Sequence, residues 1–184
     1  AKKGLDYASE LSLINVEALE KIIDWNIEKG LKVFRMSSTL FPWASEYQWD
    51  DLPDMAKIRK VLARTGQKAL DAGLRLSFHP GPFNCLTSSN PVAVDNCITD
   101  LSMHGDLMDM LQQPNSHWAK INIHIGGAYG DRPSAIDRWC SNFERLPDNV
   151  RSRLTVENDD RKNLYSTKML YCLLYTSDAA DDKQ

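Results

Sequence analysis

Short apolar runs alternate with amphipathic segments along this chain, and no other feature limits its possible folds as strongly. The runs are rich in Leu, Ile, Val and Phe, as buried strands are. Between them, apolar residues recur at helical spacing, as Leu19, Ile22 and Ile23 do. The predicted strands are 31–37, 74–79, 120–125 and 153–157. The predicted helices are 16–29, 55–72, 91–111 and 133–146, with a further helix beginning near Ser166.

The order of these elements predicts an α/β fold with a parallel sheet. Asn15 is the expected N-cap of the first helix, and Gly30 and Gly73 are the expected stops of the first two helices. A complete TIM-type (β/α) barrel takes about 250 residues. We therefore predict an incomplete barrel with about four of the eight βα units, its first and last strands missing. A small doubly wound sheet is the alternative, but no GxGxxG loop follows a predicted strand.

Composition restricts the function less than it restricts the fold. The net charge of −3 gives no support for nucleic-acid binding, although a local basic patch would be sufficient for it. The four cysteines show no metal-type spacing, so we interpret them as free thiols in a reducing compartment. No apolar run approaches the roughly 18 residues of a membrane span. We expect an intracellular protein without membrane contact; nucleus, organelle and bacterial cytoplasm are equally compatible.

The last thirteen residues, CLLYTSDAADDKQ from Cys172 to Gln184, resemble a translated transposon-type sequencing adapter. Such segments are excluded from reasoning about the fold. We therefore expect one domain, residues 5–171, followed by a non-native tail, residues 172–184. A natural polar C-terminus is the alternative interpretation.

Three chemically active side chains fall at equivalent places in successive units. His79 and His124 lie at or near the ends of two predicted strands, and Glu157 ends the next. The C-terminal strand ends of a barrel line its active site, and imidazole with carboxylate suits Zn, Mn or Fe. A carboxylate can also bridge two ions, as in two-metal hydrolases. Taken alone, each histidine is interpreted as a structural residue and Glu157 as an ion-pair partner. The three together predict a metal site.

Four motifs give the chain a resemblance to a known family. They are FRMSS (34–38), LSFHPGPF (76–83), INIHIGGAYGD (121–131) and NFERLPDNVRSRLTVENDDR (142–161). These segments resemble the UV-damage endonuclease family over about residues 5–171. The resemblance implies a TIM-type barrel that nicks damaged double-stranded DNA 5′ to UV photoproducts and leaves a 3′ hydroxyl. It also implies bound divalent ions, with Mn²⁺ as the first choice and Mg²⁺ or Zn²⁺ as alternatives.

The resemblance also implies roles for individual residues. The HPG histidine is His79, the H-x-GG histidine is His124 and the ENDD glutamate is Glu157, all metal ligands and catalytic residues in the family. The DNA-contacting positions that we assign are Arg35, Ser37, Pro82, Phe83, Asn84, Gly126, Gly127, Tyr129, Arg132, Asn158 and Asp159.

Some positions depart from the family pattern. Many members have glutamine where this chain has Pro82, and some have histidine where it has Glu46. Because proline cannot hydrogen-bond a base, we expect lesion sensing to depend on Phe83 as a wedge; a core position for Phe83 is the alternative. Further site residues would lie on the missing strands, so we expect this polypeptide as written not to be a competent enzyme, and the full-length protein to be a monomer. Two other functions stay open, a xylose-isomerase-like sugar isomerase or epimerase and a non-catalytic damage-binding scaffold.

Overall fold

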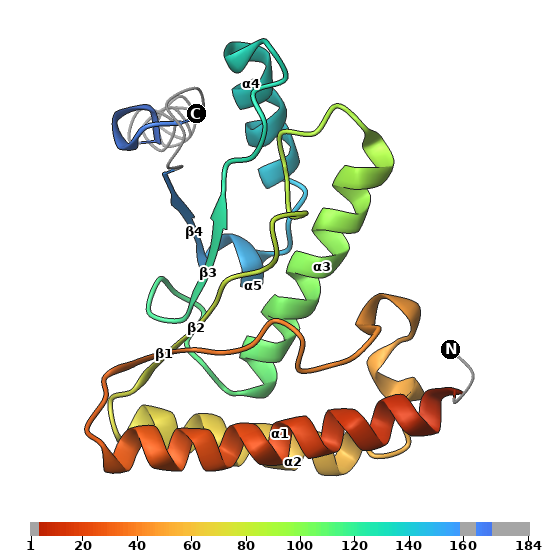
Figure 1. Cartoon of the computed structure of the whole chain (residues 1–184), viewed down its shortest axis with the longest axis vertical. Helices are drawn as coiled ribbons and strands as arrows, with labels where there is room; N and C mark the ends of the chain where they lie inside the picture. The colour runs from red at the N-terminus through yellow and green to blue at the C-terminus, as the bar shows by residue number, and fades with distance from the viewer. Residues whose placement is uncertain (1–3, 159–164, 171–184) are drawn as a thin grey trace.

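The computed structural model describes residues 4–158 and 165–170, in which helices and parallel strands alternate along the chain (Figure 1). The strands are β1 (Val33–Arg35), β2 (Arg75–Phe78), β3 (Lys120–His124) and β4 (Leu154–Glu157). The helices are α1 (Gly4–Glu28), α2 (Met55–Asp71), α3 (Pro91–Met110), α4 (Arg132–Phe143) and α5 (Asp148–Arg151), with 3₁₀ turns η1 (Ala44–Glu46) and η2 (Trp49–Asp51).

The four strands form one parallel sheet in the order β1-β2-β3-β4. Parallel crossovers are almost always right-handed. A sheet whose spatial order follows the chain therefore carries its connecting helices on one face, as in a barrel; a doubly wound sheet reverses direction at a switch point. The helices accordingly curve around one side of the strands in Figure 1. The described residues form an α/β fold with four strands of an incomplete barrel.

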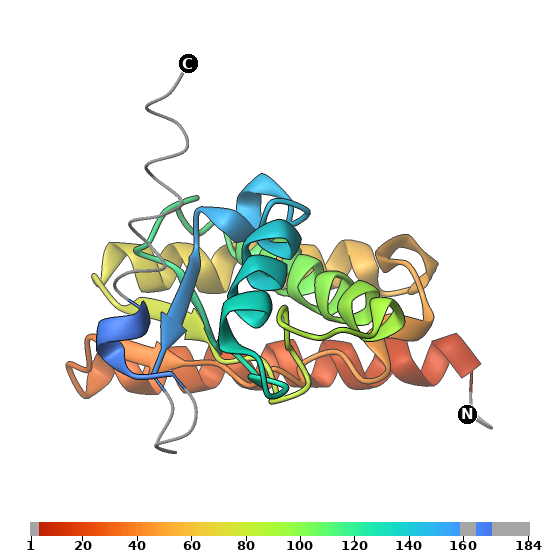
Figure 2. The same cartoon turned by 90° about the horizontal axis from the view of Figure 1, so that it is seen from above.

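Two apolar cores lie between the sheet and these helices. The first joins α1 and α2 to β2 through fully buried residues such as Ile23, Leu62 and Leu76, and α1 and α2 lie against each other along its outer side (Figure 2). The second joins α3 and α4 to β3 through residues such as Leu101 and Ile123. The two cores pack against the side of the sheet that faces the helices. The loops extend from the C-terminal ends of the strands.

The predicted helix stops are confirmed, but the predicted start of the first helix is wrong. Gly30 adopts a φ of 69°, and the Leu31 amide donates to the Asn26 carbonyl at 3.0 Å, which closes the end of α1. Helix α1 begins at Gly4, so Asn15 lies inside it and donates its side-chain amide to the Leu40 carbonyl at 2.8 Å. The earlier turns are stabilised by tertiary contacts, among them the 2.8 Å bond from Ser9 Oγ to Asp54, which local propensity does not predict.

A buried arginine joins the elements at the N-terminal end of β4. Arg153 is 1% exposed, and its guanidinium donates to Asp109 at 2.7 Å and to the Gln113 carbonyl at 2.7 Å. It also reaches the Pro114 and Asn149 carbonyls. These bonds tie α3, the loop before β3 and α5 to β4.

Among the described residues, no helix is long and apolar enough to cross a membrane. Residues 167–170 are helical, as expected for a helix that begins near Ser166. The predicted tail, residues 172–184, lies outside the described residues.

Candidate metal centre

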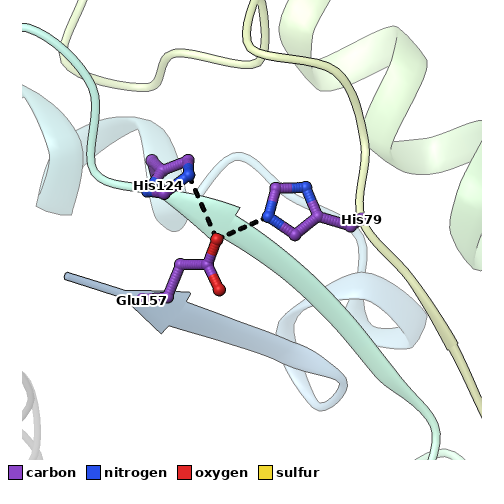
Figure 3. Close-up of side chains that lie close together, drawn as sticks. All are labelled: His79, His124 and Glu157. Atoms are coloured by element: carbon purple, nitrogen blue, oxygen red, sulfur yellow. Dashed lines mark hydrogen bonds and ion pairs between the residues drawn. The ribbon is translucent and has the colours of Figure 1, made fainter. Parts of the chain in front are cut away.

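His79, His124 and Glu157 meet at the C-terminal edge of the sheet (Figure 3). His79 directly follows β2, His124 is the last residue of β3 and Glu157 is the last residue of β4. The register of β3 and β4 pairs His124 with Glu157 directly. Residues paired across parallel strands point to the same face, so the sheet itself brings these two side chains together.

Both imidazoles approach the same carboxylate oxygen. Glu157 Oε1 lies 2.5 Å from His79 Nε2 and 3.1 Å from His124 Nε2. The two rings are 5.5 Å apart between centroids. One ligand atom from each of the three residues lies within 4.8 Å of the other two. Ligand atoms that each bond one ion at about 2.1 Å are separated by distances of this order, so the three side chains can share a divalent ion.

The surroundings of the three side chains also suit a cation. His79 Nδ1 lies 3.2 Å from the Pro80 carbonyl, a contact that helps to orient the ring. The hydrogen bond with His79 is the largest influence that holds the pKa of Glu157 below its usual value, and Asn122 adds a second bond in the same direction. Glu157 is therefore ionised at neutral pH. Two imidazoles with one carboxylate fit a divalent metal.

The loop after β3 must contain glycine at its second position, Gly126. Gly126 has a φ of 106°, and a Cβ there would lie 2.3 Å from Cys85 Sγ and 2.7 Å from Thr87 Oγ1. A Cβ at Gly127 would lie 3.1 Å from a ring carbon of Tyr129. The loops after β2 and β3 therefore pack directly against each other. Gly81, by contrast, has open space around it.

Most of the predicted DNA-contacting residues lie on the surface around this edge. Phe83 is 90% exposed, so the alternative of a core position is not what the structure has. Arg35, Ser37, Pro82, Tyr129 and Asn158 are also exposed, while Gly126, Gly127 and Arg132 are half-buried. Asp159 lies outside the described residues. DNA contact by these residues stays a prediction.

Asn84 differs from the other predicted contacts because its side chain is turned inward. It is 8% exposed and donates to the Gly81 carbonyl at 3.2 Å and to Asp100 at 2.7 Å. These bonds anchor the loop that carries Phe83 to α3. Asn84 also borders a hollow of about 600 Å³ between this loop, the β1–α2 loop and α3.

One residue of the site, Asn122, was not predicted from the sequence. Asn122 donates its side-chain amide to Glu157 Oε2 at 2.6 Å. The available signal was its position two residues before His124, because side chains of a strand alternate between faces and i, i+2 residues share one. A polar residue there, inside the apolar run KINIHI, indicates a polar partner on the same face.

The fold and the site together define a class of protein: a parallel (β/α)-barrel protein with a histidine–carboxylate cluster, compatible with a divalent metal ion, at the C-terminal edge of its strands. A sequence profile described as "UV-endonuclease UvdE" matches residues 1–175. The chain therefore belongs to the UvdE family, and the resemblance read from the motifs is confirmed.

Individual relatives agree with this assignment. The chain is 36% identical to the UV-damage endonuclease of Neurospora crassa over 85% of this chain and 24% of the relative. It is 33% identical to the UV DNA damage endonuclease of Bacillus mycoides over 91% and 52%. The crystal structure of SacUVDE superposes with a TM-score of 0.82 and 29% identity, over 91% of this chain and 55% of that chain. The chain thus spans about half the length of the Bacillus relative and a smaller share of the Neurospora relative.

Proposed function

We propose that the whole protein is a metal-dependent endonuclease that nicks DNA on the 5′ side of UV photoproducts and related lesions, leaving a 3′ hydroxyl. The observation that carries this proposal is the convergence of His79 and His124 on one oxygen of Glu157. A histidine–carboxylate cluster of this kind suits metal-assisted hydrolysis of a phosphodiester. The named relatives, UV-damage endonucleases, supply the substrate class.

In this proposal the three residues hold a divalent ion, with Mn²⁺ preferred over Mg²⁺ or Zn²⁺. Bound metal would polarise the phosphate and help to generate the attacking hydroxide. The protein's own part is to keep both Nε2 atoms and the Glu157 carboxylate aimed at one point. The Nδ1 bond of His79 to Pro80 and the pairing of His124 with Glu157 serve that purpose. The full-length chain would add further ligands.

Recognition of the damaged site would depend on Phe83. The ring stands 90% exposed on a loop that begins Pro80-Gly81-Pro82, in which the prolines restrict the backbone. A damaged base pair is weakly stacked and is opened at low cost, so an apolar wedge distinguishes it without reading a base edge. Pro82, Tyr129 and Arg132 border the same edge and would contact the duplex. The full-length enzyme would act on damaged double-stranded DNA as a monomer.

The test is a nicking assay on the full-length protein with a duplex that holds one UV photoproduct at a defined position. We expect a single cut on the 5′ side of the lesion, with a 3′ hydroxyl that a DNA polymerase extends, only when Mn²⁺ or another divalent ion is supplied. An undamaged duplex of the same sequence is the control. Equal cutting of both duplexes, or isomerisation of a ketose or aldose by the same preparation, would refute the proposal.

A further inference from the structure

Asn122 stands between the metal centre and the body of the sheet. It lies on β3 two residues before His124, on the same face, and it is half-buried. Its Nδ2 donates to Glu157 Oε2 at 2.6 Å, and its Oδ1 accepts from Thr155 Oγ1 at 3.1 Å. Thr155 lies on β4, two residues before Glu157. A chain of hydrogen bonds therefore runs from Thr155 on β4 to Asn122 on β3 and back to the Glu157 carboxylate on β4.

The chemistry of the neighbours determines the orientation of the Asn122 amide. An ionised carboxylate accepts hydrogen bonds only, so the group facing Glu157 must be the NH₂. The Thr155 hydroxyl can donate to the amide oxygen on the other side. The reverse orientation would place two acceptor oxygens against each other and leave a donor unused, so this chain of bonds has one favourable direction.

The two oxygens of Glu157 consequently have separate partners. Oε1 faces both imidazoles, at 2.5 and 3.1 Å, and Oε2 is held from behind by Asn122. The side chain of Glu157 is 39% exposed, so packing alone does not define its rotamer. Without the amide, the carboxylate could rotate and present either oxygen, or both, to an ion.

We propose that Asn122, anchored by Thr155, is a positioning residue that holds the Glu157 carboxylate so that Oε1 alone faces the metal. This inference rests on the proposed function, because it takes His79, His124 and Glu157 as the ligands. Partners that orient a ligand in this way change metal affinity by roughly 10- to 100-fold when they are removed. Asn122 itself touches no substrate atom in this scheme.

The experiment measures Mn²⁺ binding to the full-length protein by electron paramagnetic resonance of the free ion, with Mn²⁺ alone as the probe. We expect Asn122→Leu, which keeps the size of the side chain, to weaken Mn²⁺ binding by roughly 10- to 100-fold. Thr155→Val should weaken it by a smaller factor, and Thr155→Ser, which keeps the hydroxyl, should restore it. Asn26→Leu is the matched control, because Asn26 is a buried asparagine of α1 whose amide bonds its own helix at 2.7 Å.

The outcomes separate this inference from the proposed function. Wild-type Mn²⁺ affinity in Asn122→Leu would overturn the positioning role while leaving the centre intact. Mn²⁺ binding that is unaffected by Glu157→Gln would overturn both, because the ion would then lie elsewhere. If Asn122→Leu fails to fold, as judged by its circular dichroism, the Thr155→Val and Thr155→Ser pair decides. Equal affinity in those two variants would refute the anchored amide.

Discussion

His79 Nε2 lies 2.5 Å from Glu157 Oε1, although the two residues are 78 positions apart in the chain. The contact exists because β2 and β4 flank β3 in one parallel sheet and all three strands end at the same edge. It brings an imidazole and a carboxylate together at the edge where His124 also reaches Glu157.

Glu157→Gln should reduce nicking by the full-length enzyme by more than roughly 100-fold, because a neutral amide is a far poorer metal ligand than a carboxylate. Binding to damaged duplex should persist, since the substitution removes charge and hardly any contact area. Glu144→Gln is the control, because Glu144 forms a surface ion pair with Arg151 on the helical side. Parallel assays of nicking and DNA binding check both parts; undiminished nicking would exclude Glu157 from the centre.

Phe83→Ala should weaken binding to damaged duplex by roughly 5- to 150-fold, the loss of one stacked aromatic at about 1–3 kcal/mol. Metal content and melting temperature should stay unchanged, because the ring is 90% exposed. Trp118→Ala is a matched control: Trp118 is also partly exposed but precedes β3, at the opposite end of the sheet. A fall in affinity that is equal for damaged and undamaged duplexes would contradict the wedge.

Arg153→Met should lower the free energy of unfolding by about 3 kcal/mol, because it leaves buried carbonyl oxygens and Asp109 without their donor. Urea unfolding of the full-length protein measures the change. Arg151→Met, two residues earlier, should have little effect, since Arg151 forms ion pairs at the surface with Glu144 and Asp148. Similar losses in the two variants would show that the buried bonds of Arg153 contribute nothing specific.

Glu20 should make the fold sensitive to acid. The hydrogen bond from Arg64 is the main cause that lowers its pKa to about 2, and Lys68 adds to it. A lowered pKa in the folded state stabilises the protein above the unfolded value of 4.5, and this contribution disappears as the pH falls toward 2. Because Arg64 is exposed, we expect only about 1 kcal/mol.

Unfolding of the wild type and of Glu20→Gln at pH 6 and near pH 2 tests this. The difference between the two proteins should be present at pH 6 and shrink near pH 2. Glu28→Gln on the same helix, with a side chain 69% exposed, provides the comparison. A difference between wild type and Glu20→Gln that does not change with pH would argue against the ion pair as its source.

The segment after Tyr171 should differ in the natural gene. The sequence CLLYTSDAADDKQ has an explanation outside biology, as a translated adapter, and we propose that residues 172–184 are not native. Sequencing the gene from genomic DNA of the source organism checks this directly. A genomic reading frame that encodes these thirteen residues would disprove the adapter interpretation.

The sequence by itself determined the order of the elements and the three candidate ligands of the site. Alternating apolar runs and amphipathic segments have different periods, so strands and helices separate clearly along the chain. The stops at Gly30 and Gly73 were also predictable, because both adopt the positive φ that glycine tolerates best. His79, His124 and Glu157 could be placed together because parallel strands in chain order end at one edge.

Only the tertiary structure decided the features that depend on contacts between distant residues. Helix α1 extends back to Gly4 because its early turns pack against the chain near Asp54. The sequence around residues 4–15 does not predict this distant contact. Phe83 is exposed and Asn84 is buried one position later, since the loop is anchored to α3 through Asp100. The bond from Asn122 to Glu157 joins two strands. Local periodicity predicts which face of a helix or strand a residue occupies. The partner of that residue is determined by how these faces pack against each other.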